Sequence, residues 1–362
     1  MSINKKSIFK PTKSSERLEL IKQIEQERNS KVICYITGDR ESRVPRINLK
    51  TQIGEDVIPI LFRHLELMGK KDNIDLFLYT RGGDMVVPIR IVKLIRNYCK
   101  KFSILIPYRA QSAGTLIALG ADEIIMTKLG ELTPVDPTAE RHHFNPRNPS
   151  NPKEILPVSV EDVRSYILFA KDELKAQKEE ITDLYSKMTH QNYSNPIHLH
   201  PLALGNVYRA QRMIKILAER LLNLHMDIKL DSTQKIIDKI VNEITSNICV
   251  HNYPIYRDEA KSLGLKVTIS SNKLEKILWD LYEKFAEDMK LGKQFNPLEI
   301  LGQDSSRNIK YAAAYMESIN TQDTFYFDIR INKITAPQAP GQPPPLPAIN
   351  VNIAGFAWEK MR

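Results

Sequence analysis

The sequence predicts an α/β fold whose core is a parallel sheet. Short apolar runs alternate with helical patterns between residues 31 and 140, which is typical of strands joined by crossover helices. These runs are mainly apolar, as in strands that are buried on both faces. Polar or glycine-rich turns follow the runs, so each strand has a defined end.

We expect four strands and three helices in this core. The first helix should end at Gly69, because glycine commonly ends helices. The second should place Val87, Ile91 and Ile95 on one face, with Pro88 in its first turn. The third should begin within "SAGTLIALGA". The expected strands are the apolar runs at 31–37, 73–80, 102–107 and 122–127.

The chain of 362 residues divides by composition into five expected segments. Amphipathic helical patterns dominate after the α/β core, and a Pro-rich stretch containing "PPPLP" begins the C-terminal tail. The segments are an N-terminal helical arm (1–30), the α/β core (31–140), a loop (141–160), a mainly helical region with a short strand pair (161–333), and a Pro-rich linker and tail (334–362).

Composition and charge argue against several classes of protein. The net charge is +9, but basic and acidic residues are interleaved in segments such as "KDELKAQKEE", which favours a solvated face over a nucleic-acid interface. No apolar run has the length of a membrane span, and the first residues do not resemble a signal peptide. Cys34, Cys99 and Cys249 have no zinc-ligand spacing. We therefore expect a cytoplasmic protein with no metal or other cofactor.

Two turns that follow expected strands carry the chemistry. Gly82 and Gly83 follow the second strand, where glycine lets the backbone bend and bring an N–H group close to a ligand. Ser112 lies between the third strand and its helix, whose first N–H groups have no partner within the helix. Both turns should meet at the carboxyl edge of the sheet, where such folds bind ligands.

This arrangement predicts a serine nucleophile with an oxyanion hole. The N–H groups of Gly83 and Ala113 would stabilise the oxyanion that forms when the Ser112 hydroxyl attacks a carbonyl group. The alternative is structural, with Ser112 as a helix cap and the glycines as simple turn residues.

The motifs "LYTRGGD", "IPYRAQSAGTLIALGADEIIM" and "ELTPVDP" together resemble the Clp-fold serine proteases of the serine dehydrogenase proteinase family. The resemblance continues in "IHLHPLALGNVYRAQRMIKILAERLL" and "HNYPIYRDEAKSLGLKV" and covers roughly residues 31–330. It implies a ClpP/crotonase-like fold, a nucleophile at Ser112, an oxyanion turn at Gly82 and Gly83, and assembly into rings or other multimers.

Pro134, Asp136 and Pro137 match the "P-x-D-P" segment of the family. The sequence departs from the pattern of the family and its relatives in two ways. Members often have a histidine directly before the serine, where this chain has Gln111. Related Clp proteolytic subunits have their catalytic histidine about where this chain has Asp136.

The group that would accept the Ser112 proton stays open. Asp136 follows after a helix, a strand and a turn, enough chain to return to the same edge of the sheet. It is expected to act as the base, to orient a histidine or lysine, or to stabilise a turn. The other candidates are His142, His143, Lys171, Lys175, Lys178, His198, His200 and His251.

The leading hypothesis is a serine peptidase that hydrolyses peptide bonds through an acyl-enzyme on Ser112, with Asp136 as the second catalytic residue. We expect a peptide or protein substrate and a homo-oligomer, with room for a partner protein or an ATPase. The first alternative is a catalytically silent Clp-fold scaffold that binds a peptide or a protein. An acyl-CoA enzyme of the crotonase class is a third hypothesis, against which the serine at this turn argues.

Overall fold

The computed structural model describes residues 14–44, 47–135, 138–139, 143–190, 199–227, 229–248, 250, 252–334 and 348–361. The chain forms two compact units. We call the first, Met1–Leu132 with Ile255–Arg362, the sheet unit. The second, Thr133–Pro254, is the helical unit.

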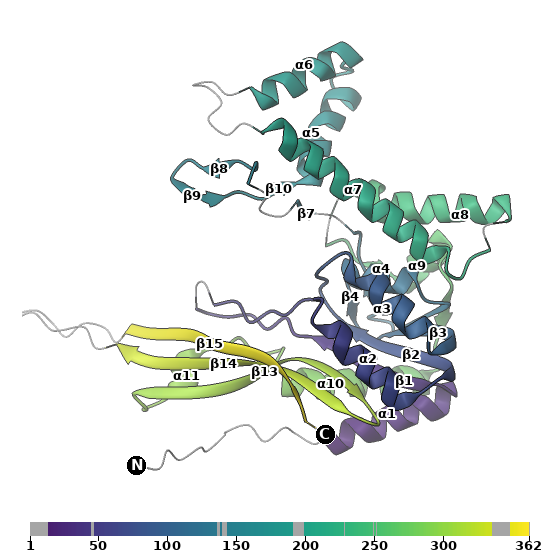
Figure 1. The fold of residues 1–362 in the computed structure, drawn as a ribbon, viewed down its shortest axis with the longest axis vertical. Coiled ribbons are helices and arrows are strands. Elements are labelled where there is room, and N and C mark those ends of the chain that lie inside the picture. The colour runs from purple at the N-terminus through teal and green to yellow at the C-terminus, as the bar shows by residue number, and fades with distance from the viewer. Residues whose placement is uncertain are drawn as a thin grey trace, which may run out of the picture. The chain divides into compact units, whose positions relative to one another are not determined.

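The core of the sheet unit is an eight-stranded mixed sheet (Figure 1). Its strand order is β12-β5-β3-β2-β1-β13-β14-β15, in which the pairs from β12 to β1 are parallel and those from β1 to β15 are antiparallel. A three-stranded sheet, β11-β6-β4, accompanies it. The strands of this unit are β1 (Lys31–Thr37), β2 (Lys71–Tyr79), β3 (Cys99–Ile106), β4 (Arg109–Ala110), β5 (Glu123–Met126), β6 (Glu131–Leu132), β11 (Ile255–Tyr256), β12 (Val267–Ile269), β13 (Ser306–Ser318), β14 (Gln322–Ile334) and β15 (Ala348–Lys360).

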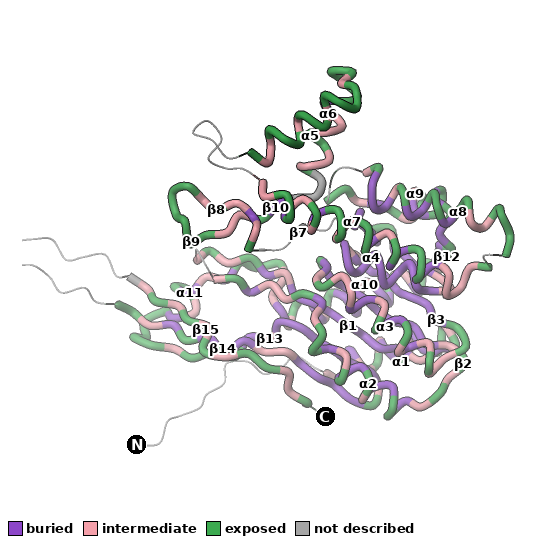
Figure 2. The backbone as a smooth tube through the Cα atoms, turned by 45° about the horizontal axis from the view of Figure 1, so that its top comes forward, coloured by how far each residue is buried: buried purple, intermediate pink, exposed green. Residues whose placement is uncertain are grey.

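Helices cover both faces of the parallel strands. On one face α1 and α10 pack on side chains that include Val32, Phe77 and Leu105. Because side chains alternate along a strand, neighbours such as Ile33 and Leu76 point to the other face. Figure 2 shows the central strands and α4 as buried. The helices are α1 (Ser14–Arg28), α2 (Val57–Met68), α3 (Val87–Arg96), α4 (Ala113–Leu119), α9 (Arg257–Leu263), α10 (Asn272–Asp288) and α11 (Pro297–Leu301).

The prediction of an α/β fold is confirmed, and so are the four strands and three helices expected in its core. The first strand has the predicted bounds, Lys31–Thr37. Pro88 lies in the first turn of α3, as predicted. The sheet is mixed instead of purely parallel, because the strand pair expected near the C-terminus, β13 and β14, joins it through β1.

The tail differs from the sequence prediction. Residues 348–360 form β15, which pairs along β14 and makes the edge of the sheet. Ring contacts of Phe325 with Phe356 and Trp358 explain how a strand that follows a Pro-rich stretch is held there. Residues 335–347, which contain "PPPLP", lie outside the described residues.

The helical unit has its own secondary structure. Helix α7 contacts α8 and the π-helix η1, while α5 and α6 are mostly exposed (Figure 2). No helix in the described part of the chain has the length and apolar character needed to span a bilayer. The elements of this unit are β7 (Thr138–Ala139), β8 (Arg147–Asn148), β9 (Asn151–Ile155), β10 (Val158–Ser159), α5 (Val160–Asp172), α6 (Lys178–Thr189), α7 (Pro201–Leu222), α8 (Asp231–Asn242) and η1 (Glu243–Asn247).

A cluster of charged side chains ties α1 to the sheet. Arg28, at the end of α1, contacts Asp75 on β2 at 2.9 Å and Glu123 on β5 at 3.0 Å. Burial acts to raise the pKa of Glu123, but hydrogen bonds from Lys101, Thr268 and Arg28 outweigh it and lower the pKa to about 2. The ionised carboxylate therefore stabilises the folded sheet unit.

We predict that this stabilisation is lost in acid. A carboxyl with a lowered pKa stabilises the fold above its unfolded pKa, and the effect disappears as the pH falls through about 5 to about 2. Glu123→Gln should lower the free energy of unfolding at neutral pH by about 1–2 kcal/mol, a figure reduced for the partial exposure of the side chain. Urea unfolding at a series of pH values measures this. Parallel curves for the two proteins between pH 7 and pH 3 would contradict it.

Candidate functional site

The two turns predicted to carry the chemistry lie side by side at the carboxyl edge of the sheet. The segment after β2 and the segment after β3 are joined at Thr80 and Ala110 by a parallel bridge. The N–H of Thr80 donates to the carbonyl oxygen of Arg109 at 2.9 Å, and the N–H of Gln111 donates to that of Thr80 at 3.1 Å. These bonds fix the glycine turn and the serine turn relative to each other.

The side chain of Thr80 connects three parts of this edge. Its hydroxyl oxygen accepts hydrogen bonds from the N–H of Gly82 at 3.0 Å and from the Thr37 hydroxyl at 2.8 Å. Its methyl group lies against α4, since a Cβ added to Gly114 would come within 2.6 Å of it. Thr80 is fully buried, so one side chain holds β1, the glycine turn and the start of α4 together.

Both glycines are required by their surroundings. Gly82 and Gly83 have φ angles of +110° and +150°, which side chains disfavour. A Cβ on Gly82 would lie 2.8 Å from the Cβ of Ser112. A Cβ on Gly83 would lie 2.3 Å from the carbonyl oxygen of Ile53. The glycine turn is therefore squeezed between Ser112 and the backbone at Ile53.

The N–H of Gly83 is directed away from Ile53. Ile53 donates to the carbonyl oxygen of Gly82 at 2.9 Å and accepts from the N–H of Asp84 at 2.9 Å. In a parallel bridge of this kind the central residue does not bond its partner through its own N–H, so the Gly83 N–H points away from Ile53. Among the described residues, neither this N–H nor that of Ala113 donates to a protein acceptor.

Ser112 has a strained backbone. Its φ of +52° with ψ of −111° is unusual for a residue with a side chain, and such conformations cost on the order of 1–3 kcal/mol. Ser112 immediately precedes α4, but its side chain accepts no capping hydrogen bond from that helix. The Ser112 side chain therefore does not cap α4 among the described contacts, and capping does not explain the strained backbone of Ser112.

The Ser112 side chain is almost fully buried. The residue is 4% exposed, and its Oγ lies 3.9 Å from the sulfur of Met85. Met85 belongs to the segment between the glycine turn and α3 and is half-buried. The Met85 side chain therefore lies against the hydroxyl.

Gln111, which replaces the histidine often found in the resembling family, is part of a polar cluster. Its amide donates to Glu131 at 2.7 Å, and Arg109 contacts the same carboxylate at 3.3 Å. Burial acts to lower the pKa of Arg109, but Tyr79, Tyr108 and nearby carboxylates outweigh it and raise the pKa. Gln111 therefore stabilises the serine turn and offers no titratable group there.

All candidate bases belong to the helical unit. Asp136, His142, His198 and His251 lie outside the described residues, as does Pro137. The others are described: His143 is exposed, Lys171 lies in α5, Lys178 begins α6, Lys175 lies between these helices, and the ring of His200 accepts from the N–H of Leu202 at the start of α7. In the described ranges, no three His, Cys, Asp or Glu side chains form a metal site.

His64, the histidine of the sheet unit, lies on α2 and is buried. Its ring nitrogens contact the Ser318 hydroxyl at 3.0 Å and the Asp323 carboxylate at 3.1 Å. All three side chains are buried, so this Ser-His-Asp set joins α2 to the β13–β14 turn and gives no opening for a substrate.

Sequence reasoning missed Thr80 and Ile53. The signal for Thr80 is a hydroxyl residue at the end of an otherwise apolar run, "LFLYT", just before the paired glycines. Nothing in the local sequence indicates that Ile53 would bond to the glycine turn, because that contact depends on the path of the loop before α2.

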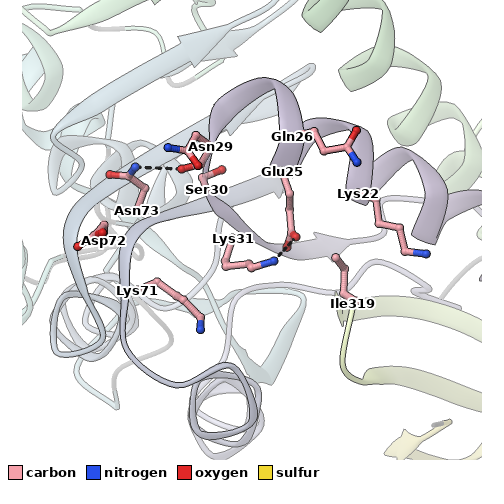
Figure 3. Close-up of a pocket in the computed structure, with 10 residues that line it drawn as sticks. All are labelled: Lys22, Glu25, Gln26, Asn29, Ser30, Lys31, Lys71, Asp72, Asn73 and Ile319. Carbon is pink, nitrogen blue, oxygen red and sulfur yellow. Dashed lines mark hydrogen bonds and ion pairs between the residues drawn. The ribbon is translucent and has the colours of Figure 1, made fainter.

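A hollow of about 600 Å³ lies at the opposite edge of the sheet (Figure 3). Lys31 and Lys71, the first residues of β1 and β2, line it. Polar contacts occupy its walls, including those of Lys31 with Glu25 and of Asn73 with the backbone of Asn29. It shares no residue with the two turns.

Comparison with known proteins supports the resemblance read from the motifs. Residues 4–146 match the family model of ClpP-like SDH-type serine proteinases, the family that the sequence motifs resemble. Two uncharacterized proteins of Methanocaldococcus jannaschii are similar over most of the chain. One is 26% identical over 74% of this chain and 79% of its own length. The other is 24% identical over 82% of this chain and 86% of its own length.

We predict that Gly83 tolerates no side chain. Gly83→Ala should lower the free energy of unfolding by about 2–4 kcal/mol, because the added carbon meets the backbone of Ile53 in a conformation that alanine disfavours. Gly292→Ala is the matched control in the same unit: nothing lies within 4 Å of its added carbon, so its effect should stay within about 0.5 kcal/mol. Urea unfolding compares them, and equal effects would contradict the prediction.

Proposed function

We propose that this protein is a serine peptidase that cleaves peptide bonds through an acyl-enzyme on Ser112. The proposal has support at two levels. Residues 4–146 match a family of serine proteinases. Independently, a strained serine lies at the carboxyl edge of a parallel sheet beside a glycine turn. The strained backbone of Ser112 is the observation that carries the proposal, because such strain concentrates at functional positions.

The oxyanion hole is proposed to consist of the N–H groups of Gly83 and Ala113, with Gly82 allowing the close approach. Ala113 follows Ser112 directly, Gly83 follows the glycine that lies against Ser112, and the described residues supply no acceptor for either N–H. A carbonyl oxygen that becomes negatively charged would accept from both. Donors of this kind are fixed before the reaction, so they need no rearrangement as charge develops.

The base is proposed to be Asp136, acting directly or through a second group. The motif "PVDP" that contains it follows β6 closely in the chain. A carboxylate is a weak base for an alcohol unless its pKa is raised, so Asp136 would act directly in an apolar setting or orient a histidine or lysine. The candidates for that second group are the lysines of residues 171–178 and the histidines His142, His143, His198, His200 and His251.

The proposed steps follow ordinary acyl transfer. The Ser112 oxygen bonds to the carbonyl carbon while its proton passes to the base, and the carbonyl oxygen takes the negative charge. The carbon–nitrogen bond then breaks, and the base returns the proton to the leaving amine. Water, deprotonated by the same base, attacks the ester and releases the carboxylic acid and the free hydroxyl.

Substrate and assembly are proposed at the level of the family. A ClpP-like proteinase acts on peptides, and homo-oligomerisation would complete or enclose a site of this kind. Displacement of the Met85 side chain from the Ser112 hydroxyl would be the step that admits the substrate.

The second candidate is a catalytically silent scaffold that binds a peptide or a protein. Two observations favour it: Ser112 is 4% exposed, and Gln111 stands where the family often has a histidine and is held by Glu131. The two candidates differ in whether the Ser112 hydroxyl is nucleophilic.

A fluorophosphonate probe tests this difference, because it reacts covalently with activated serines. We expect the full-length protein to be labelled and Ser112→Ala to lose the label. Hydrolysis of a casein substrate should fall at least about 10³-fold in the same variant. Asp136→Asn should slow both reactions while leaving thermal unfolding unchanged.

The control is Ser262→Ala, which removes an exposed hydroxyl on α9 and should be labelled like the parent protein. Absence of labelling in the parent protein, or labelling that persists in Ser112→Ala, would rule out the proposed nucleophile. Peptide binding without labelling would support the scaffold instead.

A further inference from the structure

A cleft of about 880 Å³ opens at the carboxyl edge of the sheet unit, against α10. This volume is in the range of small-molecule sites. Its walls come from the ends of β1 and β2, from Tyr108 and Arg109, from α10 and from residues 290–300. Ser112 and the two glycines are not among its lining residues.

One wall of the cleft is aromatic. The ring of Tyr282 lies 5.0 Å from that of Tyr79, 5.1 Å from that of Trp279 and 5.9 Å from that of Tyr108, measured between ring centres. Tyr79 and Tyr282 are buried, whereas Tyr108 and Trp279 are half-buried. The two half-buried rings therefore offer apolar surface to a ligand.

The other end of the cleft is lined by cationic side chains, the first of which is Arg40. This side chain is 5% exposed, and its guanidinium lies between the rings of Phe295 and Tyr311. Its Nε donates to the carbonyl oxygen of Lys293 at 2.8 Å. No carboxylate of the described residues forms an ion pair with it, and burial lowers its pKa. The two rings and the Lys293 carbonyl oxygen offset part of the cost of burying this charge, and an approaching anion would offset more of it.

Two lysines extend this end of the cleft. Burial, followed by the charges of Arg40 and Lys293, lowers the pKa of Lys290. Lys290 follows the end of α10 with a φ of +52°, at a position where glycine is usual. The negative C-terminal end of the α10 dipole attracts a lysine and accounts for Lys290 at this position. It does not account for Arg40, which follows β1 and lines the same end of the cleft.

The acidic residues of the cleft leave an excess of positive charge at this end. Asp39 lies at the aromatic side and is held by Arg81 at 2.7 Å and by Arg109 at 3.1 Å. Among the described acids, the exposed Glu299 is the one whose charge acts on both Arg40 and Lys290. The remaining acids are Glu41, which pairs with Lys50, and the exposed Glu283 and Glu287 on α10.

We propose that this cleft binds an organic anion, a ligand with a flat apolar body and a carboxylate or phosphate group. The rings of Tyr108 and Trp279 would contact the body, and Arg40, Lys290 and Lys293 would hold the anionic group. Guanidinium and ammonium groups together suit such oxygens. The site does not depend on the chemistry proposed for Ser112.

Fluorescence of Trp279 gives a direct test. The chain has two tryptophans, so Trp358→Phe leaves Trp279 as the reporter. In this background N-acetylphenylalanine tests the carboxylate, phenyl phosphate tests the phosphate, and N-acetylphenylalanine amide is the neutral match. We expect at least one anion to bind with a Kd at or below about 1 mM and about tenfold more tightly than the neutral probe.

The combined change Lys290→Asn and Lys293→Gln should weaken anion binding about tenfold or more; asparagine is chosen because it tolerates the positive φ. Lys273→Gln with Lys276→Gln, two exposed lysines of α10 outside the cleft, should leave binding unchanged. Added potassium chloride should weaken binding to the unmodified cleft, which keeps the test decisive if the double variant misfolds.

Ser112→Ala should bind the anion normally, so failure of the peptidase proposal and failure of this one are separable. The proposal is overturned if neither anion binds at millimolar concentration, if the neutral probe binds as tightly as the anions, or if salt and the cleft substitutions have no effect.

Discussion

The hydrogen bonds of Thr80 are the constraint on which the site depends. Its backbone joins the segment after β2 to the segment after β3, and its hydroxyl accepts from the N–H of Gly82. Without these bonds the glycine turn and the serine turn would be two separate loops. Because Thr80 is fully buried between β1 and α4, the rigidity of the sheet passes directly to the turns. A fixed geometry of this kind is what an oxyanion hole needs.

The backbone is strained in both turns that these bonds connect, the glycine turn and the serine turn. Gly83 adopts a left-handed conformation against Ile53, and Ser112 adopts a φ of +52° without the benefit of a cap. Packed surroundings must compensate for this cost. They include the buried helix α4 and the cluster of Gln111, Arg109 and Glu131. The same edge also carries the cleft with the buried Arg40, so the ends of the strands serve two proposed sites with different chemistry.

Much of the sheet unit could be predicted because its signals are local. Apolar runs identified β1, β2, β3 and β5, and the paired glycines and the serine turn fell on adjacent strand ends. The rest depends on long-range pairing. β15 pairs with β14 across the Pro-rich stretch, and β12 is only three residues long, so long-range pairing decides where each of these strands lies. The position of Ile53 against Gly83 likewise follows from the tertiary path of a loop. The base stays a proposal because its candidates lie on the other unit of the chain or outside the described residues.

The most direct measurement of the central claim is a crystal structure of the protein after reaction with a phosphonate inhibitor. The account predicts a covalent bond from the Ser112 oxygen to phosphorus. It also predicts that the phosphonyl oxygen accepts from the N–H groups of Gly83 and Ala113 at about 2.7–3.1 Å. An adduct whose oxygen points away from both groups, or an adduct on another residue, would contradict it.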